Sequence, residues 1–297
     1  MKAKLSIFLF FVLIFTGISS IIASPRLYGQ EVSSVWKISK NDNTVFLGGS
    51  IHILREEDFP LPEAFDRAFA ASSMLVLEAN IDELSSPDAL QYLMERMVIP
   101  DNKTLQSVLD SETYELLMAK CLEAGIPAEN VSRLKPSMVM SVLTVLEFQK
   151  WGFVQEGVDS YYFEKAKAAK TPIDFLETVQ EQIDMVVTMG DGYENDYVRY
   201  SLHDWDASFK EFLPMLSDWK KGEGAYTESE LAVVKNEWPI IYNSLLLDRN
   251  TAWVEKIEAY LTTAPVEFVV VGMAHLHGPD GLLRLLELSG CIVEQFK

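Results

Sequence analysis

Apolar runs of strand length lie near both ends of the chain. Near the start, residues 35–39 and 44–48 form two such runs, and the Asn and Asp residues between them are typical of a turn. Near the end, residues 266–271 form a run of apolar and β-prone side chains that stops at Gly272. We therefore expect a β-hairpin at the start of the chain and a buried strand near its end.

Two further short apolar runs end in glutamates. Residues 74–79 contain Glu78 at the end of an apolar run, and residues 172–176 are followed directly by Glu177. Both runs have the length of inner strands. The pattern predicts two more strands, each with a carboxylate at its end.

From Ser86 to about residue 260 the apolar positions follow a helical period. Ser86 followed by Pro87 is typical of a helix start. Residues 137–151 are apolar nearly all round, which predicts a buried helix at the centre of this region. The other helix signals are residues 111–123 and 157–170, capping boxes at Thr178 with Glu181 and at Thr227 with Glu230, and Pro279 as the first residue of a last helix that ends at Gly290.

These patterns predict one domain over residues 24–297 with an α/β (α+β) fold. Its central β-sheet is made by the N- and C-terminal segments, and a large helical insertion over about residues 86–260 lies between them. Glycine-rich and low-complexity linkers are absent from the sequence, which agrees with one domain.

Residues 1–23 have the pattern of a secretory signal peptide. Two lysines precede an apolar run, and small residues follow it. The alternative is an uncleaved membrane anchor, because residues 5–23 nearly suffice to span a bilayer. We expect an exported protein, periplasmic or extracellular, that contacts a membrane only if this segment is retained.

The chain of 297 residues has a net charge of −19, and removal of residues 1–23 changes it to −21. Such an acidic surface argues against nucleic acid as a partner, because phosphates require a basic face. It would attract metal cations to a cleft. Cys121 and Cys291 could pair in an exported protein, but two small buried residues is the favoured interpretation.

Two of the four histidines occupy matching positions. His52 follows the run at 44–48, His275 follows the run at 266–271, and each stands three residues after a glycine. Ligands of open α/β sheets gather beyond strand ends, so both Gly-x-x-His loops could face one crevice. Glu78 and Glu177 could reach the same edge. Two imidazoles and one or two carboxylates suit a divalent ion such as Mn²⁺, Co²⁺ or Zn²⁺, which supports hydrolysis.

The remaining polar candidates have two interpretations each. Arg249 and Asn250 interrupt an apolar segment, and Arg249 either binds an anionic or carbonyl group or pairs with Asp248 or Glu255 on a solvated face. His277 either joins the site or is a polar residue at the start of the last helix, and we favour the second. No H-E-x-x-H, G-x-S-x-G, P-loop or G-x-G-x-x-G motif is present in the sequence.

At these residues the chain resembles the TraB/GumN family, a relative of the Tiki metalloproteases. The first Gly-x-x-His loop has Ser50 where many members have threonine, and His277 stands where an apolar residue is usual. The stretches that carry the resemblance, in the family's order, are residues 35–38, 46–52, 77–78, 157–159, 175–178, 181–182, 249–250, 271–276, 278, 280–282 and 293–295.

The resemblance implies a metal-dependent hydrolase. It makes His52 and His275 metal ligands, and Glu78 a ligand or general base. Arg249 and Asn250 would orient substrate or stabilise an oxyanion. The remaining ligand candidate is Glu177, whose role in the family is less defined.

Three functions remain open from the sequence. The first is a hydrolase with a divalent metal ion, with a peptide bond in a peptide or protein as its expected target. The second is a non-catalytic envelope protein that binds peptide, metal or haem in the same cleft. The third is a structural accessory of an envelope polysaccharide or transfer system, in which His52 and His275 have no role.

Overall fold

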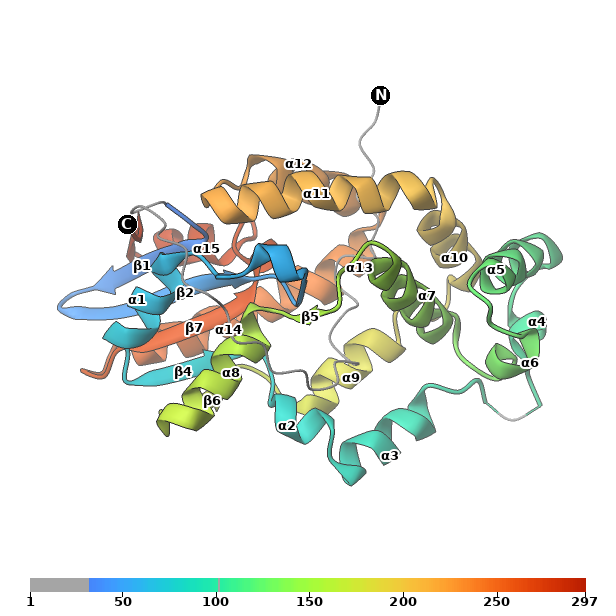
Figure 1. Cartoon of the computed structure of the whole chain (residues 1–297), viewed down its shortest axis with the longest axis horizontal. Helices are drawn as coiled ribbons and strands as arrows, with labels where there is room; N and C mark the ends of the chain where they lie inside the picture. Colours follow the sequence, from blue (N-terminus) through green and yellow to red (C-terminus); the bar gives the residue numbers. More distant parts are fainter. Residues whose placement is uncertain (1–31, 101) are drawn as a thin grey trace.

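The computed structural model describes residues 32–100 and 102–297. A β-sheet with flanking helices occupies one end of the molecule, and a group of helices occupies the other (Figure 1). The expected signal peptide at residues 1–23 lies outside the described residues. Among the helices that are described, none combines the length and the apolar character needed to cross a membrane.

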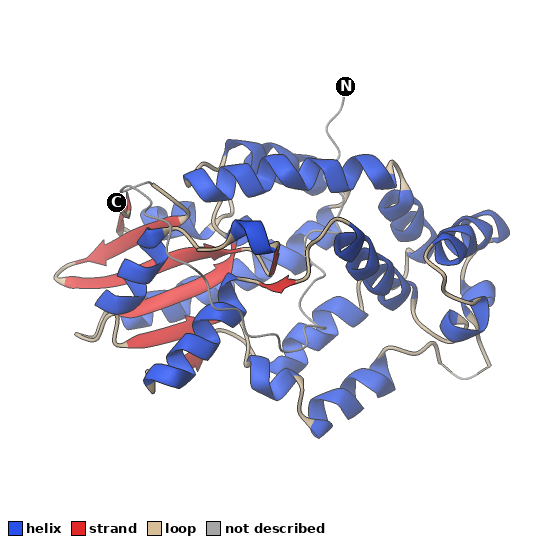
Figure 2. Ribbon diagram, in the orientation of Figure 1, coloured by secondary structure: helices blue, strands red, loops and turns tan. Residues whose placement is uncertain are grey.

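The main sheet has six strands in the order β6-β4-β7-β2-β1-β8 (Figure 2). β2 pairs in parallel with β7, β7 with β4, and β4 with β6, whereas β1 is antiparallel to both β2 and β8. The strands are β1 (Val35–Lys40), β2 (Asn43–Ser50), β4 (Met74–Leu77), β6 (Ile173–Phe175), β7 (Glu267–Gly272) and β8 (Ile292–Gln295).

This topology confirms the predicted α/β fold with a sheet from both chain ends. The predicted hairpin is β1 and β2, joined by two residues of which Asn41 has a φ of 54°. The strand from the end of the chain, β7, lies between β2 and β4 near the middle of the sheet. The short strand predicted at residues 172–176, within the helical region, is present as β6 and forms one edge of the sheet.

Helices cover both faces of the sheet. The side chains of β7 alternate between two hydrophobic clusters: Phe268 and Val270 belong to one, and Val269 and Val271 to the other. The first cluster includes apolar residues of α1 (Glu63–Ala71) and α8 (Val158–Ala169). The second includes apolar residues of α14 (Asp248–Tyr260) and α15 (Leu282–Leu288). All six residues of β7 are buried, as expected for a strand covered on both faces.

The rest of the chain is mainly helical, and α7 is its most deeply buried long helix, as predicted from its apolar surface. A small second sheet pairs β3 with β5 in antiparallel fashion. The remaining elements are β3 (Ile53–Leu54), α2 (Ile81–Leu84), α3 (Pro87–Arg96), α4 (Leu105–Val108), α5 (Ser111–Glu123), α6 (Ala128–Val131), α7 (Pro136–Lys150), β5 (Gln155–Glu156), α9 (Val179–Val187), α10 (Glu194–Leu202), α11 (Trp205–Lys221), α12 (Ala225–Glu237), α13 (Pro239–Tyr242), a π-helix (Asn243–Leu247) and 3-10 helices at Glu56–Asp58 and Met273–His275.

The helices predicted at residues 111–123 and 157–170 are present as α5 and α8. Of the four other predicted helix starts, at Ser86, Thr178, Thr227 and Pro279, two were right and two were wrong. Ser86 accepts a hydrogen bond from the backbone N–H of Ala89, and Thr178 forms the predicted capping box. Thr227 forms no cap, because α12 begins two residues earlier and takes Thr227 into its buried interior. The last helix begins at Leu282 rather than at Pro279, because residues 276–281 form a turn.

Candidate functional site

The parallel strands bring the four predicted metal ligands to one edge of the sheet. His52, Glu78, Glu177 and His275 each follow the carboxyl end of a different strand: β2, β4, β6 and β7 respectively. These four strands are neighbours in the sheet and run in the same direction. Their ends therefore meet where α/β sheets commonly bind ligands.

Arg249, on α14, lies among these side chains and contacts three of them. Its Nη2 donates to Glu78 Oε2 at 2.6 Å and to Glu177 Oε1 at 2.6 Å, and its Nε donates to Glu177 Oε2 at 2.9 Å. Its Nη1 lies 3.0 Å from His275 Nε2. The second interpretation of Arg249, a pair with Asp248 or Glu255 on a solvated face, was therefore wrong, because this guanidinium is buried in the site.

Asn250 and Trp253, also on α14, hold the second Gly-x-x-His loop. Asn250 Oδ1 lies 2.7 Å from His275 Nδ1, and Asn250 Nδ2 donates to the carbonyl oxygens of His275 and Asp280. The Trp253 ring contacts the His275 ring, with centroids 4.4 Å apart, and the Arg249 guanidinium lies 4.5 Å from the Trp253 centroid. Asn250 therefore fixes the loop that carries His275. The Trp253 ring packs against both the Arg249 guanidinium and the His275 imidazole.

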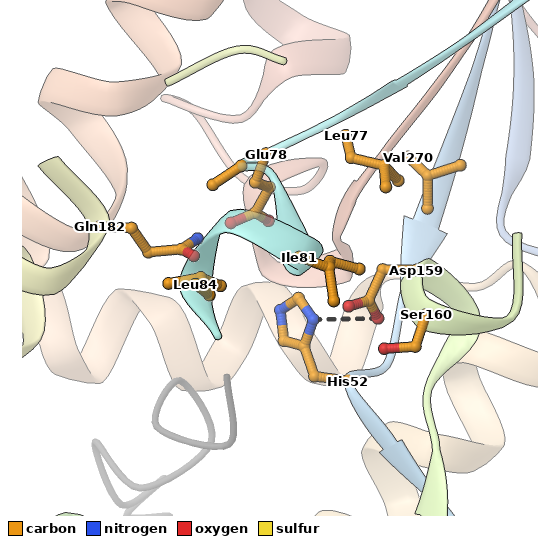
Figure 3. A pocket seen from close by; sticks show the side chains of 10 residues that line it. His52, Leu77, Glu78, Ile81, Leu84, Asp159, Ser160, Gln182 and Val270 are labelled. Carbon is orange, nitrogen blue, oxygen red and sulfur yellow. Dashed lines mark ion pairs between the residues drawn. The ribbon is translucent and has the colours of Figure 1, made fainter. Parts of the chain in front are cut away.

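Asp159, at the start of α8, faces the other histidine (Figure 3). Its Oδ1 lies 3.2 Å from His52 Nδ1, although the two do not form a well-aligned hydrogen bond. Ser50 Oγ donates to the same Oδ1 at 2.7 Å. The sequence placed Asp159 in a stretch that matches the family but assigned it no role. The sequence feature that could have identified it is its position two residues after Gly157, at the start of a predicted helix.

Gly272 allows three of the site's side chains to approach one point. A Cβ atom at this position would lie 3.2 Å from His52 Nε2, 3.4 Å from Glu78 Oε1 and 3.6 Å from His275 Cδ2. The backbone N–H of Gly272 also donates to Glu78 Oε1 at 2.7 Å. The glycine in the second loop therefore keeps this point clear, because a side chain here would project between the three groups and press on His52 Nε2.

The two histidines have different electrostatic surroundings. Burial and the Arg249 charge lower the pKa of His275 to about 3, so this imidazole is neutral. Its Nε2 lone pair then accepts from Arg249 while Nδ1–H donates to Asn250. Burial also opposes ionisation of His52, but the Asp159 carboxylate outweighs it and raises the pKa of His52. In both rings an oxygen acceptor faces Nδ1, which favours the tautomer with a lone pair at Nε2.

The two glutamates are also shifted in opposite directions. Burial opposes ionisation of Glu78, but Arg249, the two histidines and the Gly272 N–H together outweigh it and lower the pKa of this carboxyl to about 2. Burial raises the pKa of Glu177, although the Arg249 guanidinium counteracts part of that shift. Perturbed pKa values of this kind gather at functional sites, which marks this edge of the sheet as one.

A small cavity of about 40 Å³ opens beside this cluster. His52, Glu78 and Asp159 line it together with apolar side chains of α2 and with Gln182 of α9 (Figure 3). Its volume is enough for about one water molecule. The cavity therefore places the carboxylate of Glu78 and the imidazole of His52 around a space of water size.

The donors suit a divalent metal ion in kind, but their present arrangement does not fit one. His52 Nε2 lies toward Gly272, His275 Nε2 faces Arg249, and each ring has an oxygen at Nδ1, as metal-ligating histidines have. Within the described residues, however, no group of three or more His, Cys, Asp or Glu side chains is placed to hold a metal ion. The reason is that Arg249 already forms hydrogen bonds with Glu78, Glu177 and His275 Nε2.

His277 and His203 lie outside the cluster. His277 is buried with its ring edge on Trp36, at a centroid distance of 5.4 Å, and Gly224 packs directly against it. The expectation that His277 begins the last helix was wrong, because α15 starts five residues later. His203 is half-exposed and lies 2.9 Å from Asp204, as a structural histidine would.

Comparisons with known proteins agree with these motifs. A sequence model of the TraB/PrgY/gumN family matches residues 34–295. The chain is 26% identical over 243 residues to "Uncharacterized protein YbaP" from Escherichia coli (strain K12) and equally so to the protein of that name from Shigella flexneri; each alignment covers 80% of this chain and 86% of the relative. No solved structure matches the chain significantly. Because the family match covers nearly the whole described chain, with both Gly-x-x-His loops inside it, the chain belongs to the TraB/PrgY/gumN family.

Proposed function

We propose that this protein is an exported, divalent-metal-dependent hydrolase that acts on peptide bonds, in the periplasm or outside the cell. The observation that carries the proposal is the meeting of the His52 and His275 rings and the Glu78 carboxylate around Gly272, with His52 Nε2 and Glu78 Oε1 closest to it. Each imidazole has an oxygen at its other nitrogen. Such pairs of imidazole and oxygen are typical of histidines that bind metal ions.

The chain's own residues have separable roles in this proposal. His52 and His275 would hold the metal ion, Mn²⁺, Co²⁺ or Zn²⁺, which would polarise a carbonyl and lower the pKa of a bound water. Glu78 is the ligand or general base beside the water-sized cavity. Asn250 fixes the His275 loop through the carbonyl oxygens of His275 and Asp280.

The same geometry weighs against the alternative of a non-catalytic binding protein. A haem or peptide binder needs a wide apolar pocket, whereas the cavity beside His52 and Glu78 has a volume of about 40 Å³. An enzyme needs its histidines and carboxylate to converge with room for a water molecule. The convergence at Gly272 and the size of the cavity therefore support the hydrolase.

Metal content tests the proposal directly. Elemental mass spectrometry of the parent protein and of the His52→Ala/His275→Ala double variant should find near-stoichiometric Mn, Co or Zn only in the parent. His203→Ala, which removes an exposed histidine outside the cluster, is the matched control and should keep its metal. A peptide library incubated with the metal found would then identify cleaved sequences.

Two results would contradict the proposal. One is equal metal in the parent and in a folded double variant, and the other is no binding after incubation with excess divalent ions. Either would leave the non-catalytic envelope protein as the better hypothesis.

A further inference from the structure

Arg249 holds the donor atoms that a metal ion would use. Its Nη1 lies 3.0 Å from the Nε2 lone pair of His275, and its Nη2 donates to Glu78 Oε2 at 2.6 Å. His275 Nδ1 is already taken by Asn250, so Nε2 is the nitrogen left for a metal ion. A guanidinium and a metal ion cannot share the same lone pairs, because both are cations that need them.

We propose that Arg249 is an internal cation that competes with the metal ion, so that metal binds only when Arg249 gives up Glu78 and His275. The inference rests on the proposed function, because it concerns the same metal site. It explains why the donors are right in kind while no described group of them is placed to hold an ion.

Glu177 has a different role in this arrangement from the one that the sequence predicted. Both of its oxygens accept hydrogen bonds from Arg249, from Nε at 2.9 Å and from Nη2 at 2.6 Å, and Gln182 Nε2 donates to Oε1 at 3.2 Å. This is the bidentate pairing that arginine forms with carboxylates. The pair can persist when Arg249 leaves the other two groups. Glu177 therefore positions Arg249 and is not a metal ligand.

The two oxygens of Glu78 have different surroundings, one on the side of the proposed metal ion and one on the side of Arg249. One of its oxygens, Oε1, accepts from the Gly272 N–H at 2.7 Å and lies on the side of His52 Nε2. The other, Oε2, is held by Arg249. Around Arg249, the two carboxylates of Glu78 and Glu177 face one guanidinium in a buried space. An entering divalent cation then meets one like charge and two opposite ones.

The backbone next to Arg249 is irregular. The π-helix Asn243–Leu247 joins α13 directly to α14, and Arg249 Nη1 also lies 3.3 Å from the carbonyl oxygen of Leu245 in that segment. Single π-helical turns are frequent at functional sites. Leu245 thus offers the guanidinium an acceptor that does not belong to the metal site.

Cobalt binding by variants of Arg249 tests the competition. The measurement is the affinity for Co²⁺, read from its absorption spectrum and by calorimetry, in the parent protein, Arg249→Met and Arg249→Lys. We expect Arg249→Met to bind Co²⁺ at least about tenfold more tightly than the parent, a typical size for coupling between two bound groups. Arg249→Lys should lie between them, because an ammonium cannot span three partners as a guanidinium does.

Two controls assign the effect to the site. Arg55→Met removes another ion-paired arginine, one that contacts Glu57 and Asp58, and should leave Co²⁺ affinity unchanged. The His52→Ala/His275→Ala change placed in the Arg249→Met background should abolish binding. If Arg249→Met does not fold, as judged by circular dichroism, Arg249→Lys decides alone, because it keeps the charge that Glu78 and Glu177 need.

The outcomes separate the inference from the proposed function. Tighter binding by the Arg249 variants supports the competition. Equal or weaker binding by folded variants, in a protein that does bind Co²⁺, overturns the competition and leaves the metal-dependent hydrolase standing. Absence of Co²⁺, Mn²⁺ and Zn²⁺ binding in the parent and in every variant overturns both.

Discussion

Asp159 shows how one carboxylate can fix the state of a histidine. Its Oδ1 faces His52 Nδ1 at 3.2 Å, and Ser50 holds that oxygen in place. We expect the neutral His52 ring to carry its proton on Nδ1 in the parent protein and in Asp159→Asn, which keeps an oxygen there. Asp159→Ala should give a mixture of tautomers and a metal affinity about 10- to 100-fold weaker.

Nitrogen-15 NMR of labelled histidine side chains measures this tautomer directly, and the His52→Ala spectrum assigns the signals. A purely structural Asp159 would change stability but not the tautomer. An unchanged His52 tautomer in Asp159→Ala would therefore contradict the prediction.

Glu267 is a buried carboxyl at the other end of β7 from the site. It is 2% exposed, its Oε2 has no hydrogen-bond partner, and burial raises its pKa to about 7. Between the unfolded pKa near 4.5 and the folded pKa, the folded state binds more protons than the unfolded state. The free energy of unfolding must therefore fall as pH rises through this window, by about 3 kcal/mol at most.

The matched variant for this titration is Glu267→Gln, which stays neutral at every pH. Urea denaturation of both proteins at pH 5 and pH 8 should show similar stability at the lower pH and a more stable variant at the higher one. The same pH dependence in parent and variant would show that Glu267 is hydrated in the folded protein.

At the residue scale, the sequence predicted which residues lie at the site better than it predicted which of them contact one another. His52, Glu78 and His275 were found because each follows an apolar run, and the ends of such runs are visible in one dimension. The partners of Arg249 were not, because Glu78 lies 171 residues away from it in the chain. The wrong cap at Thr227 arose because its helix starts earlier, at Ala225.

Two elements that are distant in sequence are pressed together beside His52. A Cβ on Gly157 would lie 2.2 Å from the carbonyl oxygen of Ile51 and 2.5 Å from His52 Cα, both of which are backbone atoms. The same contact is continued by the pairing of β3 with β5. The loop that carries His52 is therefore packed against the segment that leads into α8.

Gly157→Ala should therefore separate these elements. The backbone of Gly157 has an ordinary φ of −79°, so the cost is steric, and we expect a loss of about 1–3 kcal/mol in the free energy of unfolding. Val154→Ala, on the same segment and 60% exposed, should change stability by less than about 0.5 kcal/mol. Equal urea denaturation midpoints for the two variants would mean that the backbone shifts to accommodate the added methyl group without loss of stability.

At the element scale, the sheet was more predictable than the helical part. Strand length, alternation and turn residues are local signals, and they located the hairpin, β4 and β7. How α9 and α14 come to face the sheet edge is set by packing between segments far apart in the chain. Trp253 is buried, and its contacts with Arg249 and His275 depend on that packing.

At the scale of the molecule, the two cysteines lie in different parts of the fold. Cys121 is on α5 in the helical end of the molecule, whereas Cys291 precedes β8 at the edge of the sheet (Figure 1). Both are free and buried, which confirms the favoured interpretation. Burial raises the pKa of Cys121 to about 11, which disfavours the reactive thiolate.

We expect the melting temperature to be the same with and without a reducing agent, because a native disulfide typically adds about 2–4 kcal/mol and none is formed here. A thiol reagent should modify both cysteines only after denaturation. A lower melting temperature under reducing conditions, or modification of the native protein, would contradict this.

The sequence established the overall architecture because one apolar pattern marks the chain ends and another marks the middle. It predicted the short strand at residues 172–176 but not its place at the edge of the sheet, because the pairing of β6 with β4 joins segments far apart in the chain. It also left open how the histidine loops and the glutamates are joined. That connection is made by one buried arginine, and burial of a charge leaves no periodic signal.

The position of β7 near the middle of the sheet has a consequence for the order of synthesis. β2 and β4 are made early, yet each needs β7 as its neighbour, and β7 is made only after the whole helical region. Until then a growing chain carries His52 and Glu78 without the strand that joins them and without His275. A partly made chain therefore cannot assemble this cluster of side chains, which forms only when the two distant parts of the sequence are both available.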